Sequence, residues 1–166
     1  GGGLDLPALS NLVRQIGELK QNHSTEILLV TSGAIAAGWE VLGEGTGAPL
    51  GLDIPSRQVL AAIGQGRLMH TYEELFQAQG VRVAQTLLTI NDLADRQSYL
   101  NVRNTLTTLL DLQVVPILNE NDVVAVDEIG EDFGDNDHLS ALVANLIDAD
   151  LLVILTDIDG LHTTDP

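Results

Sequence analysis

Apolar runs of strand length alternate along the chain with segments of helical periodicity, and this alternation restricts the fold more than any other feature. Four runs have the composition of buried strands: residues 25–33 (TEILLVTSG), 81–89 (VRVAQTLLT), 114–118 (VVPIL) and 151–155 (LLVIL). Apolar residues at helical spacing predict helices over residues 9–19, 33–43, 56–79, 99–112 and 138–147. The pattern indicates an α/β fold with a mainly parallel sheet covered by helices on both faces.

Prolines and glycines refine this prediction. Pro7 suits the first turn of the first helix, and Gly80 suits the end of the long third helix. Pro116 stands inside the third apolar run and cannot donate a hydrogen bond to a neighbouring strand. We therefore expect that strand to lie at the edge of the sheet or to be irregular at the proline.

Polar motifs follow each predicted strand. They are Ser32-Gly33, residues 89–92, residues 119–122 and Thr156-Asp157. Parallel strands end at a common edge of the sheet, and ligand sites in such sheets lie beyond the carboxyl ends of the strands. The sequence therefore predicts a site built from these turns.

Charge and residue usage exclude several classes of partner. The chain of 166 residues carries 24 acidic and 7 basic residues, a formal net charge of −17. This charge argues against binding to nucleic acid or to an anionic membrane surface. We see no apolar run of membrane-spanning length and no signal peptide, so we expect a cytoplasmic protein. Cysteine is absent and the four histidines lack ligand spacing, so no residue is predicted to bind a metal directly.

Ser32 and Gly33 lie at a predicted strand-to-helix turn. Free N–H groups and the positive end of a helix suit an anion there, but a simple helix cap explains the motif equally well. A nucleophilic serine is a weaker alternative, because Val30 and Ala34 occupy the positions where a nucleophile elbow has glycines.

The densest group of polar residues is residues 119–137 (NENDVVAVDEIGEDFGDND). Eight of its nineteen residues are Asp or Glu and three are Asn. Asp135, Asn136 and Asp137 precede or begin a predicted helix, where acidic residues are ordinary caps. The same groups could bind an ammonium group, orient a lysine or hold hydrated Mg²⁺. Asn119 and Asp122 supply similar groups from a strand end, which favours a functional site over a solvated surface.

Taken together, the motifs resemble those of the glutamate 5-kinases, a branch of the amino acid kinase family. The resemblance extends from about residue 4 to residue 166. It rests on VTSGAIAAG, AAIGQGRLM, AQTLLTINDLADRQSYLNVRNTL, VVPILNENDVVAVDEI, FGDNDHLSALVA and LLVILTDIDGLHTTDP. It implies a three-layer αβα sandwich for residues 1–166, as the substrate-binding portion of one amino acid kinase domain.

The resemblance also implies an activity and a set of roles. ATP, with Mg²⁺, would phosphorylate the γ-carboxylate of L-glutamate, the first step of proline biosynthesis. Ser32, Gly33, Asn119, Asp122 and Asn136 would bind glutamate. Asp137, with Asp135 beside it, would be catalytic by organising lysines, and Thr156 and Asp157 would contact the nucleotide. Proline would be a feedback inhibitor, and a homo-oligomer is expected.

The sequence departs from the family pattern in one respect that bears on activity. The family's K-x-G-S motif and its second catalytic lysine do not occur here, and Lys20 is the only lysine. We expect those elements to lie outside these residues and this stretch alone to be inactive. Two alternatives stay open: the kinase half of a bifunctional proline-synthesis enzyme, and a catalytically inactive regulatory or assembly module on the same fold.

Overall fold

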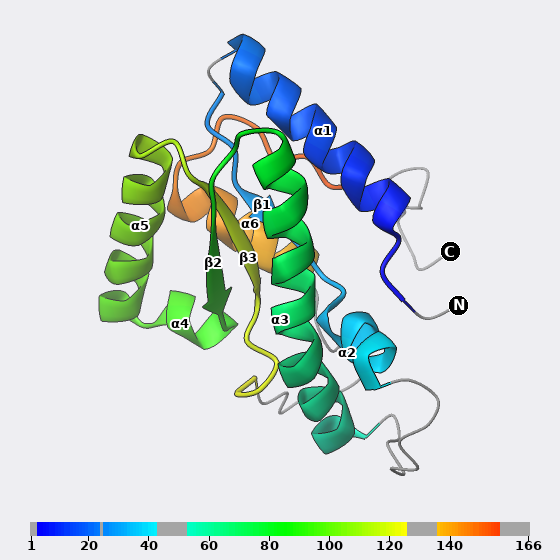
Figure 1. The fold of residues 1–166 in the computed structure, drawn as a ribbon. Helices are drawn as coiled ribbons and strands as arrows, with labels where there is room; N and C mark the ends of the chain where they lie inside the picture. Colours follow the sequence, from blue (N-terminus) through cyan, green and yellow to red (C-terminus); the bar gives the residue numbers. More distant parts are fainter. Residues whose placement is uncertain (1–2, 24, 43–52, 126–135, 157–166) are drawn as a thin grey trace.

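The computed structural model describes residues 3–23, 25–42, 53–125 and 136–156. Its elements follow one another in the order α1 (Leu6–His23), β1 (Leu29–Val30), α2 (Ala34–Leu42), α3 (Ile54–Ala78), β2 (Val83–Leu88), α4 (Ile90–Ala94), α5 (Arg96–Asp111), β3 (Val115–Glu120) and α6 (Asn136–Leu146). The described strands form one sheet in the order β1-β3-β2, and both pairings are parallel. The predicted parallel α/β architecture is therefore confirmed (Figure 1).

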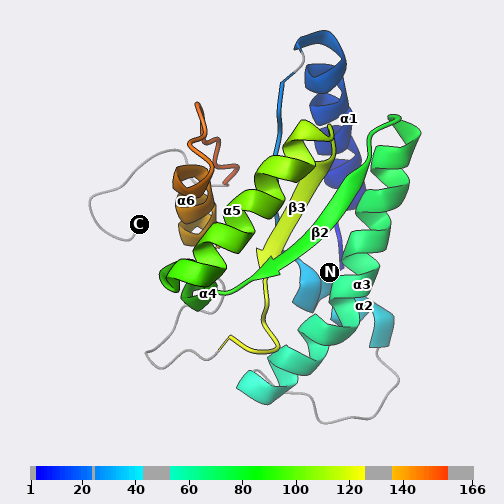
Figure 2. The same cartoon turned by 90° about the vertical axis from the view of Figure 1, so that its left-hand side faces the viewer.

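Two hydrophobic clusters lie on the two faces of this sheet. On one face, Val115 and Ile117 of β3 pack with apolar residues of α1, α2 and α3. On the other face, Leu118 packs with residues of α5 and α6. The alternation of side chains along β3 sends neighbouring residues to opposite clusters. Helices therefore cover both faces, which Figure 2 shows with α5 and α6 on one side of the sheet and α1 and α3 on the other.

The ends of the helices agree with the local sequence signals. Pro7 lies in the first turn of α1, where its missing N–H removes no helical hydrogen bond. Helix α3 ends at Ala78, and Gly80 adopts a φ of 68°, a left-handed conformation that glycine tolerates best. Thr89 and Asp92 form a capping box at the start of α4. None of the described helices is both long and apolar enough to cross a bilayer.

The position of Pro116 corrects one prediction. Strand β3 is the central strand of the described sheet, and Pro116 pairs in register with Ala84 of β2. Val115 donates its N–H to Arg82 on the β2 side, while Leu118 accepts from Thr31 on the β1 side. Backbone N–H groups alternate in direction along a strand. The nitrogen of Pro116, which carries no hydrogen, therefore points toward β1. The described pairing with β1 begins one residue later, at Ile117, so the proline interrupts no described pair.

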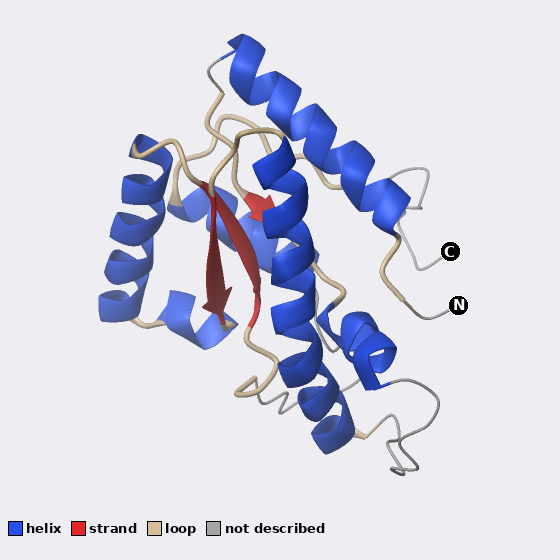
Figure 3. Ribbon diagram, in the orientation of Figure 1, coloured by secondary structure: helices blue, strands red, loops and turns tan. Residues whose placement is uncertain are grey.

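The predicted strand at residues 151–155 is also wrong for this structure. The segment forms no strand, and its side chains are exposed, with Leu151 at 77% and Leu155 at 70% exposure. Figure 3 draws the chain after α6 as loop. Apolar composition alone does not make a strand, because a strand also needs a neighbour that offers unpaired N–H and C=O groups.

Close contact between α2 and α3 fixes the position of α2. A Cβ added to Gly38 of α2 would lie 2.1 Å from the carbonyl oxygen of Leu60. Position 38 accepts only a hydrogen atom, so the two helix backbones approach closely. Helix α2 begins directly after the Ser32-Gly33 turn, and its contact with α3 therefore sets where that turn lies.

Candidate functional site

A pocket of about 470 Å³ lies beyond the carboxyl ends of β1 and β3. Its walls come from the turn after β1, the start of α2, the first turn of α3, the segment after β3 and the start of α6. The lining residues are Ser32, Gly33, Ala34, Ile35, Ala36, Trp39, Arg57, Asn119, Asp122 and Asn136. All five residues that the sequence predicted to bind glutamate are among them, brought together from three separate segments.

The Ser32-Gly33 turn gives the pocket the start of a helix. Gly33 has a φ of 109°, a conformation that residues with a Cβ rarely adopt. Its carbonyl oxygen accepts the N–H of Ala37, so the chain enters α2 directly from this turn. The N–H groups in the first turn of a nine-residue helix, with the positive end of its dipole, favour a negative ligand group.

A buried hydroxyl pair supports this turn from behind. The hydroxyl groups of Thr31 and Tyr72 lie 2.8 Å apart, and Thr31 also donates to the Ser32 carbonyl oxygen at 3.2 Å. Either hydroxyl can be the donor of the bond between Thr31 and Tyr72. Burial raises the pKa of Tyr72, and the bond to Thr31 partly opposes that rise. Tyr72 therefore stays neutral, and its hydroxyl remains paired with that of Thr31 next to the turn.

An amide network forms the floor of the pocket. Asn119 is only 3% exposed and donates through Nδ2 to Gln65 Oε1 at 2.9 Å. Its Oδ1 accepts from the backbone N–H of Glu120 at 2.9 Å and from Asn136 Nδ2 at 3.3 Å. The bond from Asn136 connects the end of β3 to the start of α6. Asn119 thus holds Asn136 through its Oδ1, while its Nδ2 donates to Gln65.

Asn136 leaves one polar atom unsatisfied. Its Oδ1 is buried and has no hydrogen-bond partner among the described residues. A buried acceptor without a partner costs free energy, about 1–3 kcal/mol. An unpaired acceptor that belongs to a pocket-lining residue is suited to a ligand that donates hydrogen bonds.

Asp122 and Arg57 bring opposite charges to the same pocket. Burial raises the pKa of Asp122, and the positive charge of Arg57 opposes that rise. Asp122 follows β3, while Arg57 lies in the first turn of α3, so the two residues come from distant parts of the sequence. The pocket therefore offers a carboxylate and a guanidinium to one ligand.

Arg57 and Trp39 were not identified from the sequence. One signal for Arg57 was present, since a basic side chain in the first turn of a helix opposes the helix dipole. Trp39 is the only tryptophan of the chain and is 40% exposed, but its helical spacing in a small-residue segment gave no indication of a pocket wall.

Of the other predicted site residues, the two that the structure describes, Asp137 and Thr156, do not line this pocket. Asp137 lies exposed in the first turn of α6, next to Asn136, and its carbonyl oxygen accepts from Ser140 at 2.7 Å. Thr156 is exposed at the end of the segment after α6. Asp135 and Asp157 lie outside the described residues. The Thr89-to-Asp92 motif also stands at a strand end, but it caps α4.

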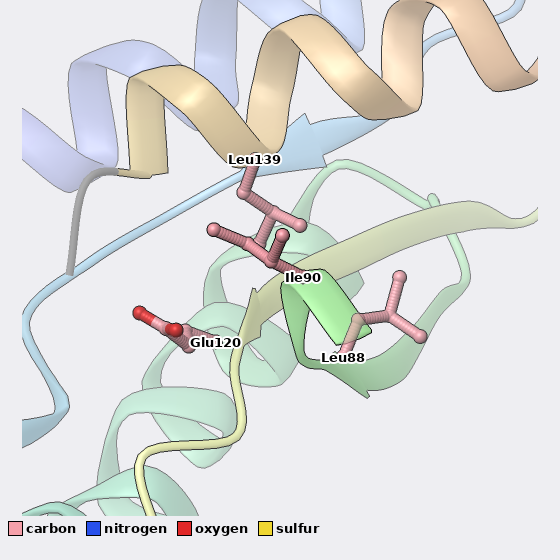
Figure 4. Close-up of a pocket in the computed structure, with 4 residues that line it drawn as sticks. All are labelled: Leu88, Ile90, Glu120 and Leu139. Atoms are coloured by element: carbon pink, nitrogen blue, oxygen red, sulfur yellow. The ribbon is translucent and has the colours of Figure 1, made fainter. Parts of the chain in front are cut away.

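A second cavity lies between the ends of β2 and β3 and the start of α6. It is lined by Leu88, Ile90, Glu120 and Leu139 and measures only about 10 Å³. Figure 4 shows the Glu120 carboxylate pointing away from the three apolar side chains. A space of this size approaches the lower limit for a single water molecule. It is a packing gap where α6 meets the sheet, and it is too small to hold a substrate.

Comparison with known proteins shows which sequences the chain resembles. The sequence profile of the amino acid kinase family matches residues 2–166. A glutamate 5-kinase of Dehalococcoides mccartyi (strain CBDB1) is 56% identical over 166 residues, covering 99% of this chain and 43% of its own length. Glutamate 5-kinases of Azoarcus sp. (strain BH72) and Citrifermentans bemidjiense are 54% and 52% identical, covering 100% and 99% of this chain and 43% of their own length.

The chain thus spans less than half the length of these curated relatives. The family match, in contrast, extends over nearly the whole chain, and the parallel sheet with helices on both faces accords with it. The protein belongs to the amino acid kinase family.

Proposed function

We propose that the protein phosphorylates the γ-carboxylate of L-glutamate with ATP, giving glutamyl 5-phosphate. An oxygen of the γ-carboxylate attacks the γ-phosphorus of ATP, a new P–O bond forms, the bond to the bridging oxygen breaks, and ADP leaves. The observation that carries the proposal is the pocket itself. It gathers Ser32, Gly33, Asn119, Asp122 and Asn136. Relatives that are identical to this chain at more than half of the aligned residues are glutamate 5-kinases.

The polar groups of the pocket suit an amino acid. The ammonium group of glutamate would donate to the carboxylate of Asp122 and to Asn136 Oδ1, the acceptor without a partner among the described residues. A hydrogen bond with two charged partners is stronger than one between neutral groups. The helix start at Ser32 and Gly33 would receive negative charge from a carboxylate or from the transferring phosphoryl group.

Residues outside the described pocket lining are assigned to ATP and to the catalytic cations. We assign contacts with ATP to Thr156 and Asp157, and we assign the organisation of cationic groups to Asp137 with Asp135. Within the described residues there is no group of three His, Asp or Glu side chains that could hold a metal ion. We propose that Mg²⁺ arrives bound to the phosphates of ATP, as is common for this ion. Inhibition by proline and assembly into a homo-oligomer remain part of the proposal.

The test is formation of an acyl phosphate by the full-length protein. ADP release in the presence of MgATP should depend on L-glutamate, and hydroxylamine should trap the product as a hydroxamate. L-Glutamine, which has an amide in place of the γ-carboxylate, should give neither signal. If ADP release occurs without hydroxamate, or if glutamine replaces glutamate, the proposed reaction is wrong.

A further inference from the structure

The charge pair in the pocket points to a role for Arg57 that the family resemblance did not assign. Arg57 lines the pocket together with Asp122 and Asn136. Its positive charge lowers the pKa of Asp122, against the larger effect of burial. Because both residues line the same pocket, one small ligand can contact the guanidinium and the carboxylate together.

The head group of an α-amino acid matches such a pair. Its ammonium and its α-carboxylate are attached to the same carbon atom, so a ligand whose ammonium binds Asp122 has its α-carboxylate nearby. A guanidinium binds a carboxylate through two parallel hydrogen bonds, which a single ammonium group cannot do. The γ-carboxylate, at the far end of the side chain, is then left for the donor groups of the Ser32-Gly33 turn and for the phosphoryl group.

We propose that Arg57 is a specificity-determining residue that binds the α-carboxylate of the amino acid substrate. This inference rests on the proposed function, because it assumes that an acidic amino acid occupies the pocket. It adds a requirement that the proposed reaction alone does not make: the α-carboxylate, which takes no part in phosphoryl transfer, should be recognised through one residue at the start of α3.

The test compares two substrates in the full-length protein. L-Glutamate carries both carboxylates, whereas 4-aminobutyrate keeps the ammonium and the reacting carboxylate but lacks the α-carboxylate. We expect the wild-type protein to prefer glutamate strongly in kcat/KM, measured as hydroxamate formation. Arg57→Gln should reduce kcat/KM for glutamate by roughly 10- to 100-fold, the range expected for a charge-assisted hydrogen bond, and change that for 4-aminobutyrate little. The preference itself should therefore decrease.

Two further variants separate recognition from a general loss of charge or stability. Arg67→Gln makes the same change on the same helix at an exposed position outside the pocket lining, and it should leave the preference unchanged. Arg57→Lys keeps the charge but loses the bidentate geometry, so it should lower the preference by a smaller factor than Arg57→Gln. If Arg57→Gln does not fold, Arg57→Lys still allows the preference for glutamate over 4-aminobutyrate to be measured.

The outcomes distinguish this inference from the proposed function. If the wild-type protein forms no hydroxamate from glutamate, the proposed function fails, and this inference fails with it. If the wild-type protein phosphorylates glutamate but Arg57→Gln lowers kcat/KM equally for both substrates, Arg57 does not bind the α-carboxylate. An undiminished preference in folded Arg57 variants would also overturn the inference.

Discussion

Gly64 of α3 lies so close to Ala34 of α2 that a Cβ built on Gly64 would stand 1.8 Å from the Ala34 carbonyl oxygen. Ala34 is the first residue of α2 and lines the pocket. The contact therefore connects the middle of a long helix to the turn that carries Ser32 and Gly33. Any atom added at Gly64 must push α2 away from α3.

Gly64→Ala should destabilise the protein, because the close atom is part of a helix backbone that cannot move alone. We expect a loss of about 1–3 kcal/mol or more in the free energy of unfolding, the range for overpacked cores. Gly66→Ala on the same helix is the matched control, since nothing lies within 4 Å of its added Cβ. That change should stabilise the helix by about 0.5–1 kcal/mol. Urea denaturation of the two variants measures both effects, and equal effects would contradict the packing argument.

Asp122→Asn should weaken binding of glutamate and leave binding of ATP unchanged. The substitution keeps the shape of the side chain and removes the charge that we assign to the substrate ammonium group. A hydrogen bond to a charged group contributes about 1.5–3 kcal/mol, which corresponds to roughly one to two decades in affinity. Steady-state kinetics should show this as a higher KM for glutamate. Asp111→Asn, at the exposed end of α5, is the control. If only the KM for ATP rises, Asp122 does not bind the ammonium group of glutamate.

The raised pKa of Asp122 predicts two opposite pH dependences. Its ordinary value is 3.8, and burial raises the pKa of Asp122 in the folded protein. The folded state therefore holds this proton to higher pH than the unfolded state does. This contribution to stability is fully present below the ordinary value and is lost as the pH rises through the raised one. Binding of an ammonium group has the opposite sign, because it needs the ionised carboxylate and weakens as the pH falls through the same range.

Both dependences can be measured against Asp122→Asn, which does not titrate at this position. The unfolding free energy of the wild type, relative to that of the variant, should decrease as the pH rises above about 4. Arg57→Gln should shift the fall in glutamate affinity to higher pH, since it removes the charge that opposes the effect of burial. A difference between wild type and Asp122→Asn that is independent of pH would show that Asp122 has an ordinary pKa.

Asp137→Asn separates catalysis from stabilisation of the helix start in α6. Asp137 lies in the first turn of α6, where an acidic side chain contributes about 0.3–1 kcal/mol through the helix dipole. If this is its only role, the variant should melt at a slightly lower temperature and keep a kcat close to that of the wild type. If Asp137 organises catalytic cations, kcat should fall by orders of magnitude while KM changes little, because those cations act mainly in the transition state. Thermal melting and steady-state kinetics on the full-length protein decide the question. Wild-type turnover in the folded variant would remove Asp137 from the catalytic residues.

Local chemistry made much of the fold predictable. The long helix predicted over residues 56–79 is α3, Ile54–Ala78, and the glycine predicted to end it adopts the left-handed conformation. The last helix, predicted over residues 138–147, is α6, Asn136–Leu146. These predictions succeeded because apolar periodicity, prolines and glycines act within a few residues of each other. The strand at residues 151–155 failed because strand formation depends on a partner that composition does not specify.

The sequence by itself determined the class of fold, the positions of five of the six described helices and the polar turns that follow the strands. It placed Ser32, Asn119 and Asn136 at the ends of their elements, which was enough to predict that they share one edge of the sheet. Only the tertiary structure decided that β3 is the central strand despite its proline. It also decided that Asn119 holds Asn136, and that Arg57 faces the same pocket as Asp122. The reason is physical: turns and helices are specified by neighbours in sequence, whereas strand order and the meeting of distant side chains follow from how the whole core packs.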